Sequence, residues 1–296
     1  MTSGLVRAKH NVLRSLNQRP VPTAAKPLII FSHGNSFPAS TYGAMTAELA
    51  ARGYTVKAIE KLGHDPAYPV TSNWPHLVKQ LADFAELEAK RSKAPVFLIG
   101  HSLGGFLSLM CAAKHPQLAH GALKGVVLLD SPIIGGWRAK VLLLGKLTGV
   151  LSRRGPGAVS QKRKQLWSST DEAFLHFRSK RGFARWDDAA IARYVDGGTV
   201  AVGSQRRLAF DRDIETSIYN SLPHNMAALL ARHPLPCPVA FIGGQQSVEM
   251  KQAGLAMTRR ITQGRMQLVE GSHLFPIENP LATAAAIDAE LVRMLG

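Results

Sequence analysis

Short apolar runs alternate with segments of helical periodicity along most of this chain, and this alternation constrains the fold more than any other feature. The apolar runs lie at residues 28–34, 54–60, 95–102, 123–132, 237–245 and 265–273. The helical segments lie at residues 41–53, 74–91, 103–116, 248–261 and 280–295. Strands that alternate with helices pair in parallel, and the helices then cover both faces of the sheet. The sequence therefore predicts an α/β fold with a mostly parallel central sheet.

The alternation stops between residues 133 and 222, in a basic segment that contains tryptophan and phenylalanine and is mostly compatible with helix. Because the alternation then resumes, we interpret residues 133–222 as a helical cap inserted into one α/β domain and lying over one end of its sheet. Residues 27–132 and 223–296 form the core of that domain. The glycines of GGTVAVGSQ (residues 197–205) lack a preceding strand and the spacing of a dinucleotide-binding loop, so no cofactor is expected.

Residues 1–26 are predicted to be a basic N-terminal arm. The arm contains no acidic residue, and its cationic residues include Arg7, Lys9, Arg14 and Arg19. Weak organelle presequences share this composition. No secretory hydrophobic segment is found, so we expect a cytoplasmic protein, with organelle import as the alternative. Cys111 and Cys237 have neither disulfide nor metal-ligand spacing, and no metal site is expected.

The charge of the chain is strongly positive, with 36 Lys and Arg against 20 Asp and Glu and a net charge of +16 over 296 residues. Such a charge attracts nucleic acid, anionic lipid or anionic substrates. No nucleic-acid-binding motif and no interleaved aromatic platform is found, which argues against nucleic acid as a partner. Much of the charge falls in residues 152–165 and 177–186, inside the predicted cap. A solvated basic surface is the simpler interpretation, and contact with an anionic substrate group or a membrane surface is the other.

The segment VFLIGHSLGG (residues 96–105) ends a predicted strand with the pattern Gly-x-Ser-x-Gly. Gly100 and Gly104 flank Ser102, and small flanking residues allow the tight strand-to-helix turn that exposes a serine hydroxyl. The N-terminus of the helix that follows favours a developing negative charge. This pattern, between an apolar strand and a helix, is typical of a nucleophilic serine.

Polar side chains follow several of the predicted strands directly. They are Asn35, Ser102, Asp130 and His273. The carboxyl ends of parallel strands meet at one edge of a sheet, where the sites of α/β proteins form. We therefore expect these four residues to gather at that edge.

These motifs resemble those of the α/β-hydrolase superfamily. The segment FSHGNSFPAS resembles its His-Gly loop, GHSLGG its nucleophile elbow, and GSHLFPIENP its histidine loop. The resemblance covers residues 27–132 and 223–296 and implies that Ser102 attacks a carbonyl group and His273 takes its proton. It also implies that the backbone N–H groups of Asn35 and Leu103 bind the oxyanion.

The acid of the implied triad is left open between two residues. Members of the superfamily often have an aspartate after the penultimate strand, but here the segment GGQQSVE has Ser247 at that position. Asp130 follows an earlier strand, at a second position that some members use, and is the preferred candidate. Glu249 is the alternative. A serine at the elbow argues against dehalogenase and epoxide-hydrolase chemistry, which uses an aspartate there.

We therefore expect a serine hydrolase that cleaves a carboxylic ester through an acyl-enzyme. The expected substrate is a small ester or acyl compound whose apolar part lies against the cap. An acyl thioesterase, a lysophospholipase-like lipid hydrolase and a carbon–carbon bond hydrolase are the enzymatic alternatives. A non-catalytic binding protein with the same fold is the alternative outside enzymes.

Overall fold

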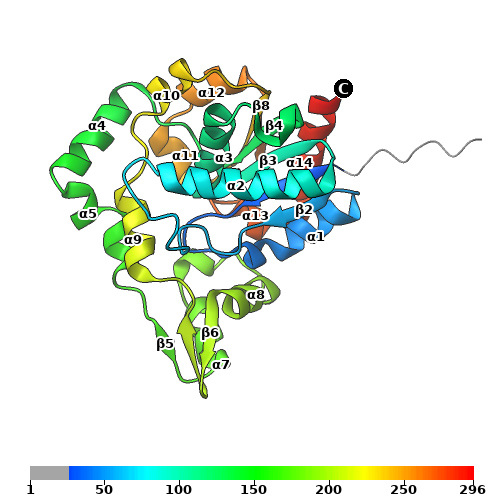
Figure 1. The fold of residues 1–296 in the computed structure, drawn as a ribbon. Helices are drawn as coiled ribbons and strands as arrows, with labels where there is room; N and C mark the ends of the chain where they lie inside the picture. The colour runs from blue at the N-terminus through cyan, green and yellow to red at the C-terminus, as the bar shows by residue number, and fades with distance from the viewer. Residues whose placement is uncertain (1–26) are drawn as a thin grey trace, which may run out of the picture.

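The computed structural model describes residues 27–296, and the basic arm predicted at residues 1–26 lies outside the described residues. A sheet of six parallel strands forms the centre of the molecule (Figure 1). In spatial order the strands are β2 (Thr55–Ala58), β1 (Leu28–Ser32), β3 (Val96–His101), β4 (Leu123–Leu129), β8 (Val239–Gly244) and β9 (Met266–Val269). The predicted α/β class with a parallel sheet is confirmed.

Helices cover both faces of this sheet (Figure 1). One layer contains α2 (Pro75–Ser92), α3 (Leu103–Lys114) and α10 (Met226–Arg232). The other contains α1 (Gly43–Ala51), α13 (Phe275–Glu278) and α14 (Pro280–Leu295). Leu28 and Ile30 of β1 pack against the first layer, and Ile29 and Phe31 against the second. Because both faces are buried, the strands read as continuous apolar runs in the sequence.

One predicted helix is wrong in its extent. Residues 248–261 form two helices, α11 (Val248–Ala253) and α12 (Ala256–Thr262). The chain turns at Gly254, whose φ of 73° lies in the left-handed region that glycine adopts without strain. Two short 3₁₀ helices, η1 (Ala39–Tyr42) and η2 (Leu118–Gly121), precede α1 and β4.

Residues 133–222, called the inserted segment below, connect β4 to the last helix before β8. Its helices are α4 (Gly136–Leu147), α5 (Val150–Arg154), α6 (Pro156–Ser160), α7 (Thr170–Arg178), η3 (Arg181–Phe183), α8 (Asp188–Gly198) and α9 (Arg212–Asn220). The segment also holds a small antiparallel sheet, with β7 (Gln205–Leu208) between β5 (Leu166–Trp167) and β6 (Thr199–Val202). The helical expectation missed this sheet, in which Gly203 and Ser204 form the two-residue turn of a hairpin.

Aromatic side chains bury the inserted segment against the loop that follows β1. The ring of Tyr194 on α8 lies 5.6 Å from that of Phe37 and 4.9 Å from that of Phe177. Phe183 and Trp186 complete this cluster, which is continuous with the core on one face of the central sheet. The packing holds the inserted segment at the carboxyl ends of the strands.

None of the helices in the described part of the chain has the length and apolar character that crossing a membrane requires.

Candidate active site

Ser102 lies in the turn between β3 and α3, and its neighbouring glycines are sterically required there. Its φ of 53° and ψ of −115° are a strained combination for a residue with a side chain. A Cβ atom on Gly100 would lie 2.1 Å from the carbonyl of Gly104, and one on Gly104 would lie 1.9 Å from the carbonyl oxygen of Ser32. Strand and helix thus approach each other more closely than any larger residue allows, and the turn presents Ser102 at the sheet edge.

The backbone N–H groups of Leu103, the first residue of α3, and of Asn35, in the loop after β1, have no acceptor among the described residues. The Leu103 group belongs to the first turn of the helix, where N–H groups have no intrahelical partner and the helix dipole favours an anion. These are the two groups that the sequence resemblance assigns to oxyanion binding.

His273 follows β9 and forms a short hydrogen bond with Asp130, which follows β4. The distance between His273 Nδ1 and Asp130 Oδ2 is 2.6 Å. Asp130 is almost completely buried, and its Oδ1 accepts the backbone N–H of Gly244 at 2.9 Å. A buried carboxylate with these donors is well placed to orient an imidazole ring.

Ser247, at the position where the superfamily often has its acid, is a partner of Asp130. Its hydroxyl donates to Asp130 Oδ2 at 2.5 Å and accepts the N–H of Met250 at 3.0 Å, as the N-cap of α11. Glu249 lies beside this group, with one carboxylate oxygen within 4.8 Å of the ligand atoms of Asp130 and His273. Its side chain is exposed, and no hydrogen bond joins it to His273. Of the two candidate acids, Asp130 is therefore the one that contacts the imidazole.

Asp130, Glu249 and His273 also resemble a set of metal ligands, but the distance between Asp130 and His273 is that of a hydrogen bond. The 2.6 Å between Nδ1 and Oδ2 is typical of a charge-assisted hydrogen bond, and Gly244 and Ser247 already donate to the carboxylate. Asp130 thus has its acceptor sites directed at three donors.

The pKa of His273 lies above its ordinary value of 6.5. Burial alone would lower the pKa, because it disfavours the charged ring. The hydrogen bond and the charge of Asp130 outweigh burial, and the charges of Glu249 and Glu278 act in the same direction. The ring is therefore a stronger base than a free histidine.

His101 connects the elbow to the loops on either side of it. Its Nε2 lies 2.8 Å from the backbone oxygen of His273, and its Nδ1 lies 2.7 Å from the hydroxyl of Tyr42. The same hydroxyl accepts the N–H of Gly34 at 3.1 Å. These contacts require His101 to carry its proton on Nε2. Burial, together with the nearby charge of His273, lowers the pKa of His101 well below its ordinary value, so the ring stays neutral.

A buried ion pair within the inserted segment is hydrogen-bonded to the loop that carries Asn35. Glu215 on α9 is fully buried, and its carboxylate accepts hydrogen bonds from Arg163 Nη1 and from the hydroxyl of Ser36. The backbone oxygen of Glu215 accepts Asn35 Nδ2 at 3.0 Å. Tyr194 completes the group by donating to the backbone oxygen of Ser36 at 3.2 Å. The inserted segment therefore fixes the conformation of this loop.

A cleft of about 1030 Å³ opens beside that loop, between it and the inserted segment. The aromatic residues of its wall are Phe37, Phe177, Phe183, Tyr194 and Tyr219. Its cationic residues are Arg153, Lys162, Arg163, Lys164 and Lys180, against one acidic residue, Glu215. The cleft combines an apolar surface for a chain or ring with a positive field.

The model of a family described as the alpha/beta hydrolase family matches residues 29–286. The chain belongs to the alpha/beta hydrolase family. This chain is 24% identical over 175 residues to a monoglyceride lipase homolog of Monkeypox virus, a stretch that covers 55% of this chain and 62% of the relative. It is 31% identical over 107 residues to a pyrethroid hydrolase of Sphingobium wenxiniae, covering 35% of this chain and 37% of the relative. The matches thus span less than two thirds of these curated relatives.

Solved structures share the fold of this chain over most of its length. The E-2-(acetamidomethylene)succinate hydrolase has a TM-score of 0.66 and 24% identity, and the match covers 90% of this chain and 92% of the other. The thioesterase domain from the curacin biosynthetic pathway has a TM-score of 0.65 and 18% identity, with coverage of 88% and 91%. At these identities the likeness shows the fold alone.

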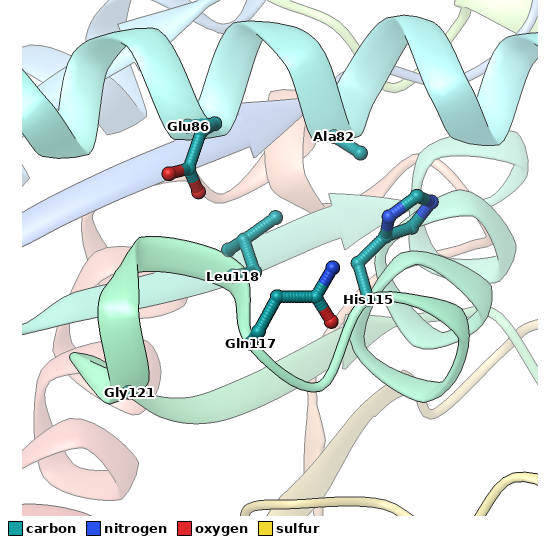
Figure 2. Close-up of a pocket in the computed structure, with 6 residues that line it drawn as sticks. All are labelled: Ala82, Glu86, His115, Gln117, Leu118 and Gly121. Atoms are coloured by element: carbon teal, nitrogen blue, oxygen red, sulfur yellow. The ribbon is translucent and has the colours of Figure 1, made fainter.

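A second, smaller hollow lies away from the cleft and from Ser102 and His273. It has a volume of about 290 Å³ and lies between α2 and the turn that precedes β4 (Figure 2). The residues that line it are Ala82, Glu86, His115, Gln117, Leu118 and Gly121. Because β4 begins next to this turn, the hollow lies at the amino end of that strand, opposite the edge of the sheet that Ser102 and His273 follow.

Several residues that shape the site could not be assigned from the sequence. Ser247 stands where the superfamily often has its acid, although a serine directly before a predicted helix is also an N-cap signal. His101 occupies a variable position of the Gly-x-Ser-x-Gly pattern, which gives no signal for its contacts. The role of Glu215 had no sequence signal, because its partner Asn35 is 180 residues away.

Proposed function

We propose that this chain is a serine hydrolase that cleaves a carboxylic ester through an acyl-enzyme. The observation that carries the proposal is the 2.6 Å hydrogen bond between His273 and Asp130, formed at the sheet edge where the elbow presents Ser102. Asp130 is the orienting acid in this proposal, and Glu249 contributes only its charge.

The proposed reaction begins with attack by Ser102 Oγ on the ester carbonyl. His273 holds its own proton on Nδ1, toward Asp130, so its Nε2 is free to take the proton of Ser102. The N–H groups of Asn35 and Leu103 stabilise the oxyanion, and each such donor is typically worth about 3 kcal/mol. Collapse of the tetrahedral intermediate breaks the ester bond, and the alcohol leaves with the proton from His273. Water then attacks the acyl-enzyme, again with His273 as base, and releases the acid.

The cleft supports an ester whose acyl part is apolar. Its lining includes Phe37, two residues beyond the proposed oxyanion donor Asn35, but not Ser102 or His273. In this proposal the distal part of the acyl group therefore lies against the aromatic wall. The names of the relatives, monoglyceride lipase homolog and pyrethroid hydrolase, also favour hydrolysis as the activity.

A second candidate is hydrolysis of an acyl thioester with an anionic leaving group. The five cationic side chains of the cleft favour it, because they would attract phosphates on the leaving group. The same catalytic residues would serve, with a thiol leaving in place of an alcohol.

A fluorophosphonate probe tests the nucleophile directly. We expect wild type and a control variant, Ser152→Ala, to be labelled and to hydrolyse p-nitrophenyl esters, whereas Ser102→Ala does neither. Ser152 is exposed on α5 and bonds only to the backbone. An unlabelled wild type would favour a non-catalytic binding protein, and equal labelling of Ser102→Ala would refute the assignment. Matched acyl esters and acyl-coenzyme A thioesters then separate the two substrate classes.

A further inference from the structure

Helix α4 turns an apolar face toward solvent. Trp137, Val141, Leu144 and Leu147 are 65%, 57%, 60% and 76% exposed. Their spacing of four, three and three residues places them on one face of the helix. No residue of α4 is fully buried, and Figure 1 shows the helix at the edge of the molecule, away from the central sheet. A helix this poor in buried contacts has an apolar face that none of residues 27–296 covers.

The apolar face continues along the chain into the next two short helices. Val150 begins α5 and Val159 lies on α6, and both are exposed. α5 packs against both α4 and α6. Exposed apolar side chains on neighbouring helices are typical of an interaction site.

The segment that carries this face is rich in cationic residues. No acidic residue occurs between Asp130 and Asp171, a stretch that holds eight cationic residues: Arg138, Lys140, Lys146, Arg153, Arg154, Lys162, Arg163 and Lys164. Lys140 is exposed within the apolar face itself, and the guanidinium of Arg138 lies 4.7 Å from the ring centre of Trp137. A partner for this face must therefore combine an apolar interior with negative charge.

The opposite side of α4 attaches the helix to the body of the molecule. Lys146 Nζ donates to the backbone oxygen of Leu222 at 2.9 Å and to the hydroxyl of Ser72 at 3.0 Å. Arg138 packs over Gly254, where an added Cβ would lie 3.0 Å from the guanidinium. With both ends held, the helix presents its apolar face outward in a fixed orientation.

We propose that the exposed face of α4, α5 and α6 docks on the surface of a bilayer that contains anionic lipids. Tryptophan and leucine on one face of a helix, with lysine and arginine beside them, suit the boundary between headgroups and acyl chains. The cations add electrostatic attraction to an anionic surface. Arg153 and Val159 also line the cleft, so docking brings the cleft next to the lipid surface. The docking itself does not depend on the proposed hydrolysis.

Trp137 is a natural reporter of this docking. The other three tryptophans, Trp74, Trp167 and Trp186, are at most 2% exposed. Adding phosphatidylcholine vesicles that contain phosphatidylglycerol should shift the emission of the full chain to the blue, and bromine-labelled lipids should quench it. Vesicles of phosphatidylcholine alone should have a much weaker effect, and salt should weaken the effect of the anionic vesicles. Trp137→Phe should abolish the shift but keep co-sedimentation with the vesicles.

A pair of double variants tests the location of the docking face. Leu144→Glu with Leu147→Glu should lower the vesicle partition coefficient at least about tenfold, because two exposed apolar side chains are lost and two negative charges are added. The control, Leu281→Glu with Val292→Glu, makes the same charge change at two exposed positions of α14 and should bind as wild type does. Hydrolysis of a water-soluble ester should be equal in all three proteins.

Three results would overturn the proposal. They are the absence of any shift or co-sedimentation with anionic vesicles, full binding by the α4 double variant, and an emission shift that depends on protein concentration without vesicles. The last would mean that a second copy of the chain covers the face. Because vesicle binding is measured without substrate, its failure is separate from a failure of the proposed hydrolysis.

Discussion

Replacing Asp130 with asparagine should abolish most of the proposed activity by reversing one hydrogen bond. Gly244 N–H donates to Oδ1 of Asp130, so the amide oxygen of asparagine must take that position. The NH₂ group then occupies the position of Oδ2, 2.6 Å from His273 Nδ1. An NH₂ group there donates to Nδ1, which places the ring proton on Nε2, where it blocks transfer from Ser102.

The expected loss is about 10⁴-fold in kcat, as for the corresponding change in other triads, or about 5 kcal/mol of barrier. Stability should change by only about 1–2 kcal/mol, because the hydroxyl of Ser247 can turn to accept from the new amide. Hydrolysis of a p-nitrophenyl ester and urea denaturation measure the two effects. Glu249→Gln is the matched control and should change kcat severalfold at most, since its carboxylate makes no hydrogen bond to His273. A loss below tenfold in Asp130→Asn, or a loss of orders of magnitude in Glu249→Gln, would refute this reasoning.

Two further predictions concern the elbow and the base. Gly104→Ala should destabilise the fold by about 3 kcal/mol or more, because its Cβ would meet a backbone oxygen of β1 at 1.9 Å. Gly182→Ala, where no atom lies within 4 Å, should be neutral in the same denaturation assay. In a pH profile of kcat/KM, activity should fall as pH drops through the raised pKa of His273, because a protonated ring cannot act as a base; the midpoint should lie above 6.5. Glu249→Gln should move that midpoint downward, and an unchanged midpoint would contradict the charge contribution of Glu249.

The central sheet was predictable because its strands are buried on both faces. Ile29 and Ile30 face opposite layers, so neither face interrupts the apolar pattern. The hairpin in the inserted segment lacked that signal, because its strands are only four residues long and Val200 and Val202 are exposed. The break at Gly254 was missed because a single glycine also occurs within helices.

The candidate site was predictable where a residue directly follows a strand. Ser102 and His273 could be assigned to the sheet edge from that rule alone. The choice between Asp130 and Glu249 could not be made, because both fall near the same edge and only the three-dimensional contact separates them. The contacts of His101 could not be predicted from the sequence either, because Tyr42 and His273 are 59 and 172 residues away from it.

The bonds between Glu215 and the loop after β1 limit how this protein can be re-engineered. Exchanging residues 133–222 for the segment of a relative would remove a carboxylate and a carbonyl that Ser36 and Asn35 use as acceptors. A chimera would have to supply an acceptor at the position of Glu215, together with a cation such as Arg163, or the loop would lose its shape. Substrate range is therefore better altered one cleft side chain at a time than by transplanting the segment as a module.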